Sequence, residues 1–119
     1  MVERERQQSL SYFLDKGEEN KLFIRYVFTQ NYSGIEEFAV VYCIIEGKNI
    51  YEVVRYDCSK REAVHTHKFF CKKPEKRSLE REASFDTMQY FIELIEKNWR
   101  EYRLKFMEKR QSQKHLYNI

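Results

Sequence analysis

The chain has 119 residues, of which 42% are hydrophobic and 16% aromatic. This length suits one compact domain, and this apolar content excludes an intrinsically disordered chain. The charges nearly balance, with 22 basic against 19 acidic side chains, so the net charge of +3 alone does not indicate a nucleic-acid partner.

The first part of the chain predicts an N-terminal arm over 1–20, followed by a sheet over 21–71. Leu10, Phe13 and Leu14 have helical spacing, which predicts a short helix or ordered arm within the first 14 residues. Alternation of apolar and polar side chains then predicts four strands, at 21–30, 35–45, 50–57 and 64–71. Short turns join them, so we expect a four-stranded antiparallel meander. The second strand is almost continuously apolar, which is typical of a central strand covered on both faces.

The second part of the chain predicts a charged linker over 72–83, a helix over 84–110 and a tail over 111–119. Ser84 is a good N-cap, and Asp86 stands where the helix dipole favours a carboxylate. The apolar positions of the helix form one stripe: Phe85, Met88, Ile92, Ile95, Trp99, Tyr102 and Phe106. We expect this stripe to cover one face of the sheet, which makes the chain a single α+β domain.

The predicted helix is longer than the predicted strands. It measures roughly 39 Å at 1.5 Å per residue, whereas a strand of eight residues measures about 27 Å. Its last turns should therefore overhang the sheet and need a further partner. A homodimer through the C-terminal helix is one way to supply that partner.

Two short motifs predict the candidate site. Arg55 and Asp57 alternate on one strand, and His65 and His67 alternate on the next. Residues two apart share a face of a strand, so the four side chains cluster if Asp57 lies opposite His65. A slip of one residue would place the histidines on the other face from the arginine and the aspartate.

Three kinds of chemistry fit this cluster. In a metal-independent ribonuclease, one imidazole takes a proton from a ribose 2′-hydroxyl and the other protonates the leaving oxygen, while Arg55 holds the phosphate. In a metal site, Asp57 would be a third ligand beside His65 and His67. In a purely structural cluster, Asp–His and Arg–Asp pairs only satisfy a polar sheet face. We adopt the acid–base interpretation, with no metal and no cofactor.

Basic side chains surround the histidine strand, and aromatic side chains stand among them. A single-stranded nucleic acid requires both, for phosphate neutralisation and for base stacking. A solvated charged linker is the alternative explanation of the same pattern. The predicted nucleic-acid-binding residues are Tyr56, Lys60, Arg61, Lys68, Lys72 and Lys73.

The order of Arg55-Tyr56-Asp57, then His65-Thr66-His67, then a long helix resembles that in small uncharacterised archaeal and bacterial proteins. Some of these resemble TumE-type toxins of toxin–antitoxin systems. The resemblance covers about residues 35–110. It implies a toxin that acts on RNA through Arg55, Asp57, His65 and His67, with a helix-turn-helix antitoxin as its protein partner.

The sequence therefore predicts a toxin-like endoribonuclease, and the alternative is a non-catalytic module that binds nucleic acid or protein. No apolar stretch is long enough to cross a bilayer, and the first residues are polar and of mixed charge. The odd number of cysteines, without a paired spacing, does not suggest a disulfide framework. We therefore expect a cytoplasmic protein with no membrane contact.

Overall fold

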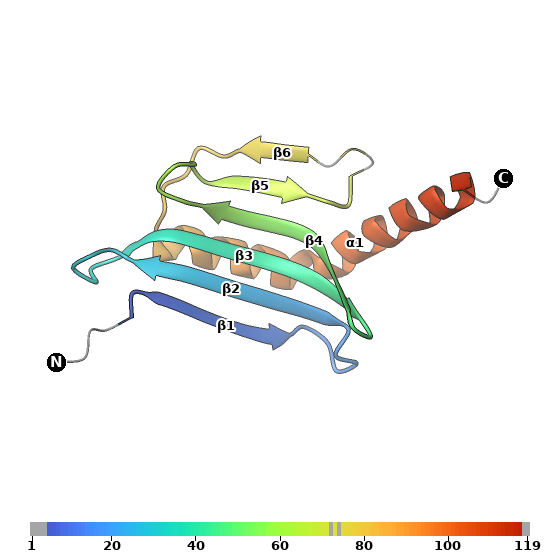
Figure 1. The fold of residues 1–119 in the computed structure, drawn as a ribbon, viewed down its shortest axis with the longest axis horizontal. Helices are drawn as coiled ribbons and strands as arrows, with labels where there is room; N and C mark the ends of the chain where they lie inside the picture. Colours follow the sequence, from blue (N-terminus) through green and yellow to red (C-terminus); the bar gives the residue numbers. More distant parts are fainter. Residues whose placement is uncertain (1–4, 72, 74, 118–119) are drawn as a thin grey trace.

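The computed structural model describes residues 5–71, 73 and 75–117, and it describes side chains up to residue 112. This part of the chain forms an α+β fold of six strands and one helix (Figure 1). In chain order these are β1 (Gln7–Phe13), β2 (Asn20–Phe28), β3 (Ile35–Glu46), β4 (Asn49–Cys58), β5 (His65–Lys68), β6 (Glu75–Ser78) and α1 (Phe85–Tyr117). Each strand pairs antiparallel with its neighbours in the chain, so the sheet is a meander without crossovers. No helix in these residues combines the length and apolar character needed to cross a membrane.

The four predicted strands are confirmed as β2 to β5, although β5 is shorter than expected. The prediction for β3 is also confirmed, because it lies inside the sheet and its middle is buried on both faces. Val40 and Tyr42 belong to the main core, whereas Ala39, Val41 and Cys43 form a second small cluster on the opposite face.

The predicted N-terminal helix is wrong, because these residues form β1. The chain alternates Ser9 and Ser11 with Leu10 and Tyr12, which is the pattern of a strand. Tyr12 pairs with the core residue Leu22, and the two serines take the other face of the sheet. The arm is therefore an edge strand of the sheet.

The predicted linker over 72–83 and the predicted tail over 111–119 also need correction. Within the linker, Glu75–Ser78 forms β6, a four-residue strand with no apolar side chain. Hydrogen bonds between the backbones of β5 and β6 hold this strand in place. Its side chains therefore need not alternate between apolar and polar, and the sequence pattern does not predict the strand. The helix does not end at Arg110 but continues to Tyr117.

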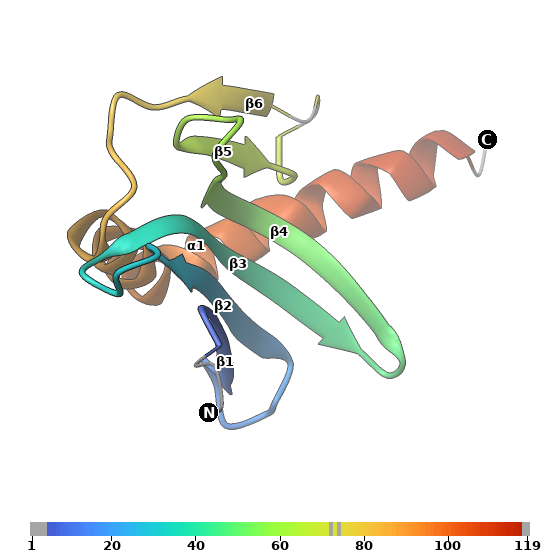
Figure 2. The ribbon, with the colours of Figure 1, turned by 60° about the vertical axis from the view of Figure 1, so that its left-hand side comes forward.

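The helix α1 packs along one face of the sheet, mainly against β3 and β4 (Figure 2). The prediction that its apolar stripe is core is confirmed from Met88 to Phe106, whereas Phe85 at the start of the helix is 41% exposed. Trp99 is only 7% exposed and meets the ring of Tyr42 edge-on, with 6.2 Å between the ring centroids. Phe91 stacks on Tyr56 at a centroid distance of 4.3 Å. These contacts fix which face of β4 is turned away from the helix.

We call the face of the sheet that lies away from α1 the open face. Its middle is lined by Ala39, Val41 and Cys43, with Phe23 and Ile45 packed beside them. The last turns of α1 extend past the sheet (Figure 1), which confirms the predicted overhang. The homodimer through this helix stays a prediction.

Candidate functional site

The register between β4 and β5 brings the predicted cluster together. Asp57 lies opposite His65, and Arg55 lies opposite His67. Residues directly opposite in an antiparallel pair share a face, and the neighbours Tyr56 and Thr66 are buried on the helix side. All four predicted side chains therefore lie on the open face.

Asp57 and His65 form the tightest contact of this cluster. His65 Nε2 lies 2.6 Å from Asp57 Oδ1, and His65 Nδ1 lies 2.8 Å from the carbonyl oxygen of Ala63. A carbonyl oxygen can only accept, so Nδ1 carries a proton. Asp57 Oδ1 is buried and has no other hydrogen-bond partner among the described residues. The contact at Nε2 is a hydrogen bond when that nitrogen carries a proton, and otherwise two electron-pair donors face each other there.

His67 is the more accessible histidine of the pair. Its ring is half-buried, and its centroid lies 4.8 Å from that of His65. The ring also stacks on Phe69, with centroids 5.9 Å apart. Within the described chain, neither ring nitrogen of His67 has a hydrogen bond or an ion pair. These nitrogens are available to a bound molecule.

The surroundings of His67 lower its pKa from the ordinary value for histidine. Burial is the largest cause, because it disfavours the charged ring. Asp57 acts in the opposite direction and raises the pKa, but three nearby cations add to the lowering: His65, Lys76 and Arg55. The neutral ring that results can accept a proton or bind a metal ion.

Arg55 is already paired with two carboxylates. Its Nη1 lies 3.5 Å from Asp57 Oδ2, and its Nη2 contacts Glu52 closely. Burial opposes the charge of Arg55, but Glu52 and then Asp57 outweigh it and raise the pKa of the guanidinium. Arg55 is therefore less available to a phosphate than the sequence predicted, because its charge is largely balanced inside the cluster.

Two charged residues that the sequence did not predict, Glu62 and Lys76, complete the cluster. Glu62 Oε2 lies 3.3 Å from His65 Nε2, and Lys76 Nζ lies 3.0 Å from the same carboxylate oxygen. The hydrogen bond from Lys76 lowers the pKa of Glu62. Lys76 lies opposite His67 on β6, a relationship that could be found only after β6 was known.

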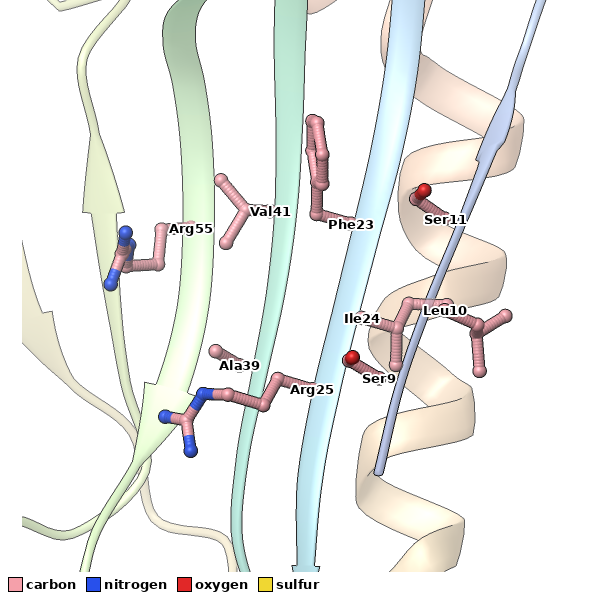
Figure 3. A pocket seen from close by; sticks show the side chains of 9 residues that line it. All are labelled: Ser9, Leu10, Ser11, Phe23, Ile24, Arg25, Ala39, Val41 and Arg55. Atoms are coloured by element: carbon pink, nitrogen blue, oxygen red, sulfur yellow. The ribbon is translucent and has the colours of Figure 1, made fainter. Parts of the chain in front are cut away.

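A shallow hollow of about 390 Å³ lies on the open face beside Arg55. Arg25 extends from β2 across Ala39 toward β4, whereas the guanidinium of Arg55 turns toward β5 (Figure 3). No acidic side chain of the described residues lies within ion-pair distance of Arg25. The side chains that line the hollow come from four strands: Ser9, Ser11, Phe23, Arg25, Ala39, Val41 and Arg55.

Two of the predicted nucleic-acid-binding residues lie on the wrong face. Tyr56 is 5% exposed and stacks on Phe91 in the core, so it cannot stack on a base. Lys68 pairs with the core residue Val54 and follows His67 directly, so it points to the helix side of the sheet. Tyr56 alternates with Arg55 and Asp57 on β4, and Lys68 alternates with His67 on β5, so period-two alternation alone places both on the helix side.

The other predicted basic residues lie at the margin of the cluster. Lys60 and Arg61 are exposed in the turn between β4 and β5, and Lys60 Nζ lies 3.4 Å from Glu36. Lys73 is exposed beyond the end of β5. Lys72 lies outside the described residues.

The donor atoms of Asp57, His65 and His67 all lie within 4.8 Å of one another. Two imidazoles and one carboxylate at this spacing can move protons, and they can also ligate a metal ion. Proton transfer and metal binding thus compete for the same atoms.

Comparisons with known proteins identify a family but no function. No curated protein and no solved structure matches the chain. A family model described as a domain of unknown function, DUF7718, matches residues 3–112. This match covers β1 to β6 and most of α1, including the whole cluster on the open face. The chain therefore belongs to the DUF7718 family.

Proposed function

We propose that this protein is a small RNA-directed enzyme, a metal-independent endoribonuclease of the toxin type. One observation supports it most: two histidines in different hydrogen-bonding situations lie in one cluster, beside a hollow whose Arg25 has no ion pair among the described residues. Acid–base cleavage of RNA requires one group that accepts a proton and one that donates it. His67, whose ring nitrogens have no hydrogen bond within the described part of the chain, suits the base, and the ion-paired His65 suits the acid.

The proposed reaction conserves protons. His67 takes the proton of a ribose 2′-hydroxyl, and the 2′-oxygen attacks the adjacent phosphorus. The bond from phosphorus to the 5′-oxygen breaks, and His65 Nε2 gives that oxygen a proton. The products are a 2′,3′-cyclic phosphate and a 5′-hydroxyl end. The carboxylate of Glu62, which is half-exposed beside His65 Nε2, would have to move aside for the leaving oxygen.

The hollow supplies the groups that a single strand requires. Arg25 offers a cation that no acidic side chain of residues 5–71, 73 and 75–112 pairs with, and Phe23 offers an aromatic ring beside it. A phosphate on Arg25 and a base on Phe23 would place the next phosphate toward Arg55 and His67. Lys60 and Arg61 would then contact the strand as it leaves the cluster.

The toxin part of the proposal rests on the resemblance to TumE-type proteins and on the order of the elements. It would bring a helix-turn-helix antitoxin as the protein partner. The second candidate function is a non-catalytic module that binds nucleic acid or protein. The pairing of Arg55 with Glu52 and Asp57 favours this candidate, because it leaves Arg55 less available to stabilise a reacting phosphate. Binding of a nucleic acid through Arg25 requires neither Arg55 nor the histidines.

The decisive experiment incubates the full chain with labelled single-stranded RNA in EDTA. The parent should cleave it to 2′,3′-cyclic ends. His67→Ala should lose about 10²–10⁴-fold in rate, the usual contribution of a general base, while retaining RNA affinity. Arg25→Ala should bind more weakly and with a shallower salt dependence. Arg77→Ala is the matched control, because Arg77 is exposed on β6 and lies in register with the buried Thr66 of the helix side.

Two outcomes would reject the enzyme. If the parent binds RNA in a salt-sensitive way but cleaves none, the binding module remains. If the parent neither binds nor cleaves RNA, both nucleic-acid readings fail, and a protein partner becomes the remaining function of the open face.

A further inference from the structure

We propose that Asp57, His65 and His67 form a binding site for a divalent transition-metal ion of the Zn²⁺ or Co²⁺ type. This goes beyond the proposed ribonuclease, which needs no metal and uses the same two histidines, and it is tested by measurements that do not involve RNA cleavage. The sequence interpretation assigned no metal to the cluster. The geometry of the folded chain points to one.

The three ligands come from a rigid frame. Asp57 and His65 lie opposite each other in a paired β4–β5 register, and His67 is two residues further along β5 on the same face. Their donor atoms lie within 4.8 Å of one another. Donors that share one zinc ion at about 2.0–2.2 Å lie roughly 3–4 Å apart. To share one ion, the donors of Asp57 and His65 would have to separate from 2.6 Å, and the whole group would have to close from within 4.8 Å.

The outer contacts already resemble those that orient metal ligands. His65 donates its Nδ1 proton to the carbonyl oxygen of Ala63 at 2.8 Å, which aims Nε2 into the cluster. Metal-ligating histidines usually hold their other ring nitrogen in this way. Asp57 Oδ2 contacts Arg55 Nη1 at 3.5 Å, which leaves Oδ1 directed at His65.

One buried atom points to a cation in particular. Asp57 Oδ1 is buried, and its neighbour at 2.6 Å is a ring nitrogen, itself an electron-pair donor when it is not protonated. Two atoms that each offer an electron pair repel each other at this distance unless a positive centre lies between them, either a proton or a metal ion. His67, with no hydrogen bond among the described residues, supplies the third electron pair.

The donor set selects the class of metal. Two imidazole nitrogens with one carboxylate suit Zn²⁺, Co²⁺ or Ni²⁺, whereas Mg²⁺ and Ca²⁺ prefer oxygen ligands. Glu62, whose carboxylate oxygen lies 3.3 Å from His65 Nε2, is placed to give a fourth ligand. Lys76 holds that carboxylate at 3.0 Å and would have to release it.

The experiment uses the untagged full chain, freed of metal with EDTA and then exchanged into chelator-free buffer. Co²⁺ is titrated while its visible absorption is recorded, Zn²⁺ is then added in competition, and calorimetry gives the stoichiometry. We expect one ion per chain, an absorption band typical of nitrogen and oxygen ligands, and a Zn²⁺-dependent rise in Tm.

Three variants locate the ion. Asp57→Asn and His67→Gln should each lower Zn²⁺ affinity by more than about 10-fold, since even the loss of an outer-shell partner costs roughly 10–100-fold. Glu52→Gln is the matched control, because it also removes a carboxylate from Arg55 but lies outside the three ligands. It should bind Zn²⁺ as the parent does.

Three results would overturn the site. The first is that the folded parent shows no saturable binding of Zn²⁺ or Co²⁺. The second is that the parent and both ligand variants bind Zn²⁺ with equal affinity. The third is that Glu52→Gln loses as much Zn²⁺ affinity as the ligand variants do. His67→Gln protects the test against misfolding, because His67 is half-exposed and its replacement leaves the Asp57–His65 pair in place. None of these readouts depends on RNA cleavage, so failure of the metal site and failure of the ribonuclease are separate results.

Discussion

The hydroxyl of Tyr42 donates a hydrogen bond of 2.5 Å to Oδ1 of Asn20, and Arg103 Nε donates to the same oxygen at 3.2 Å. One amide oxygen thus joins β2, β3 and α1. Asn20→Ala should destabilise the protein by about 1–3 kcal/mol, because it leaves the buried Tyr42 hydroxyl without its partner. Urea unfolding followed by circular dichroism measures the change.

The double variant Asn20→Ala/Tyr42→Phe provides the control for this contact. Removing both partners should cost less than the sum of the two single changes, by about 0.5 kcal/mol or more. Strictly additive losses would show that the hydroxyl and the amide do not depend on each other.

Trp99 anchors α1 on the sheet. Trp99→Ala should cost about 3–5 kcal/mol, the range for deletion of a large core aromatic. Leu104→Ala on the same helix is the control, since Leu104 is 61% exposed and exposed positions usually change stability by no more than about 0.5 kcal/mol. Equal melting temperatures for the parent and the Trp99 variant would contradict the packing described here.

The Asp57–His65 pair should stabilise the β4–β5 hairpin as well as form the site. Asp57→Asn keeps the shape of the side chain but removes its charge, so it should cost about 1.5–3 kcal/mol, as for a hydrogen bond to a charged group. Glu52→Gln, at a half-exposed ion pair, should cost less than about 1 kcal/mol. Comparable losses for the two variants in chemical unfolding would argue against a special contact at Asp57.

The lowered pKa of His67 predicts that the stability of the protein depends on pH. Its pKa in the folded protein is lowered below the ordinary 6.5, so between these two values the unfolded chain binds a proton that the folded chain does not. The stability linked to neutral His67 is therefore complete above about pH 6.5 and is lost as the pH falls toward the folded pKa. His67→Gln should flatten the stability profile in that acidic window and leave its slope at higher pH unchanged.

The unfolding free energies of the parent and of His67→Gln are measured side by side across this pH range. Their difference gives the pH-dependent contribution of His67 to stability. Groups common to both proteins cancel in that difference. A constant offset at every pH would mean that the folded surroundings of His67 do not disfavour its charge.

The sequence was most informative where both partners of a contact lie on neighbouring strands. Arg55, Asp57, His65 and His67 alternate on two strands joined by a short turn, so period two and one register assumption were enough to predict their clustering. The same alternation, applied to Tyr56, already placed its ring on the opposite face. The basic and aromatic composition around Tyr56 favoured a base-stacking role, whereas its position on the strand places the ring in the core against Phe91.

Other parts of the fold carried weaker signals. The alternation of Leu10 and Tyr12 with serines was outweighed by a helical spacing that includes Leu14, which lies beyond the end of β1. β6 has only polar side chains and is stabilised by its backbone, which no side-chain pattern reveals. Arg25 reaches the site only because small Ala39 stands between β2 and β4, a relationship that requires the register of three strands.

The meander also has a consequence for the order in which the molecule assembles. Every strand pairs with the strand before or after it in the chain, so contacts of short sequence separation dominate the sheet, which favours rapid folding. The residues from Asp57 to His67 lie within a single hairpin, and hairpins close in about 1–10 μs. A lone hairpin is only marginally stable, and α1 reaches the sheet from the far end of the sequence. We therefore expect the chemical groups of the open face to meet early and transiently, and to be held in place only when the helix docks on the other side.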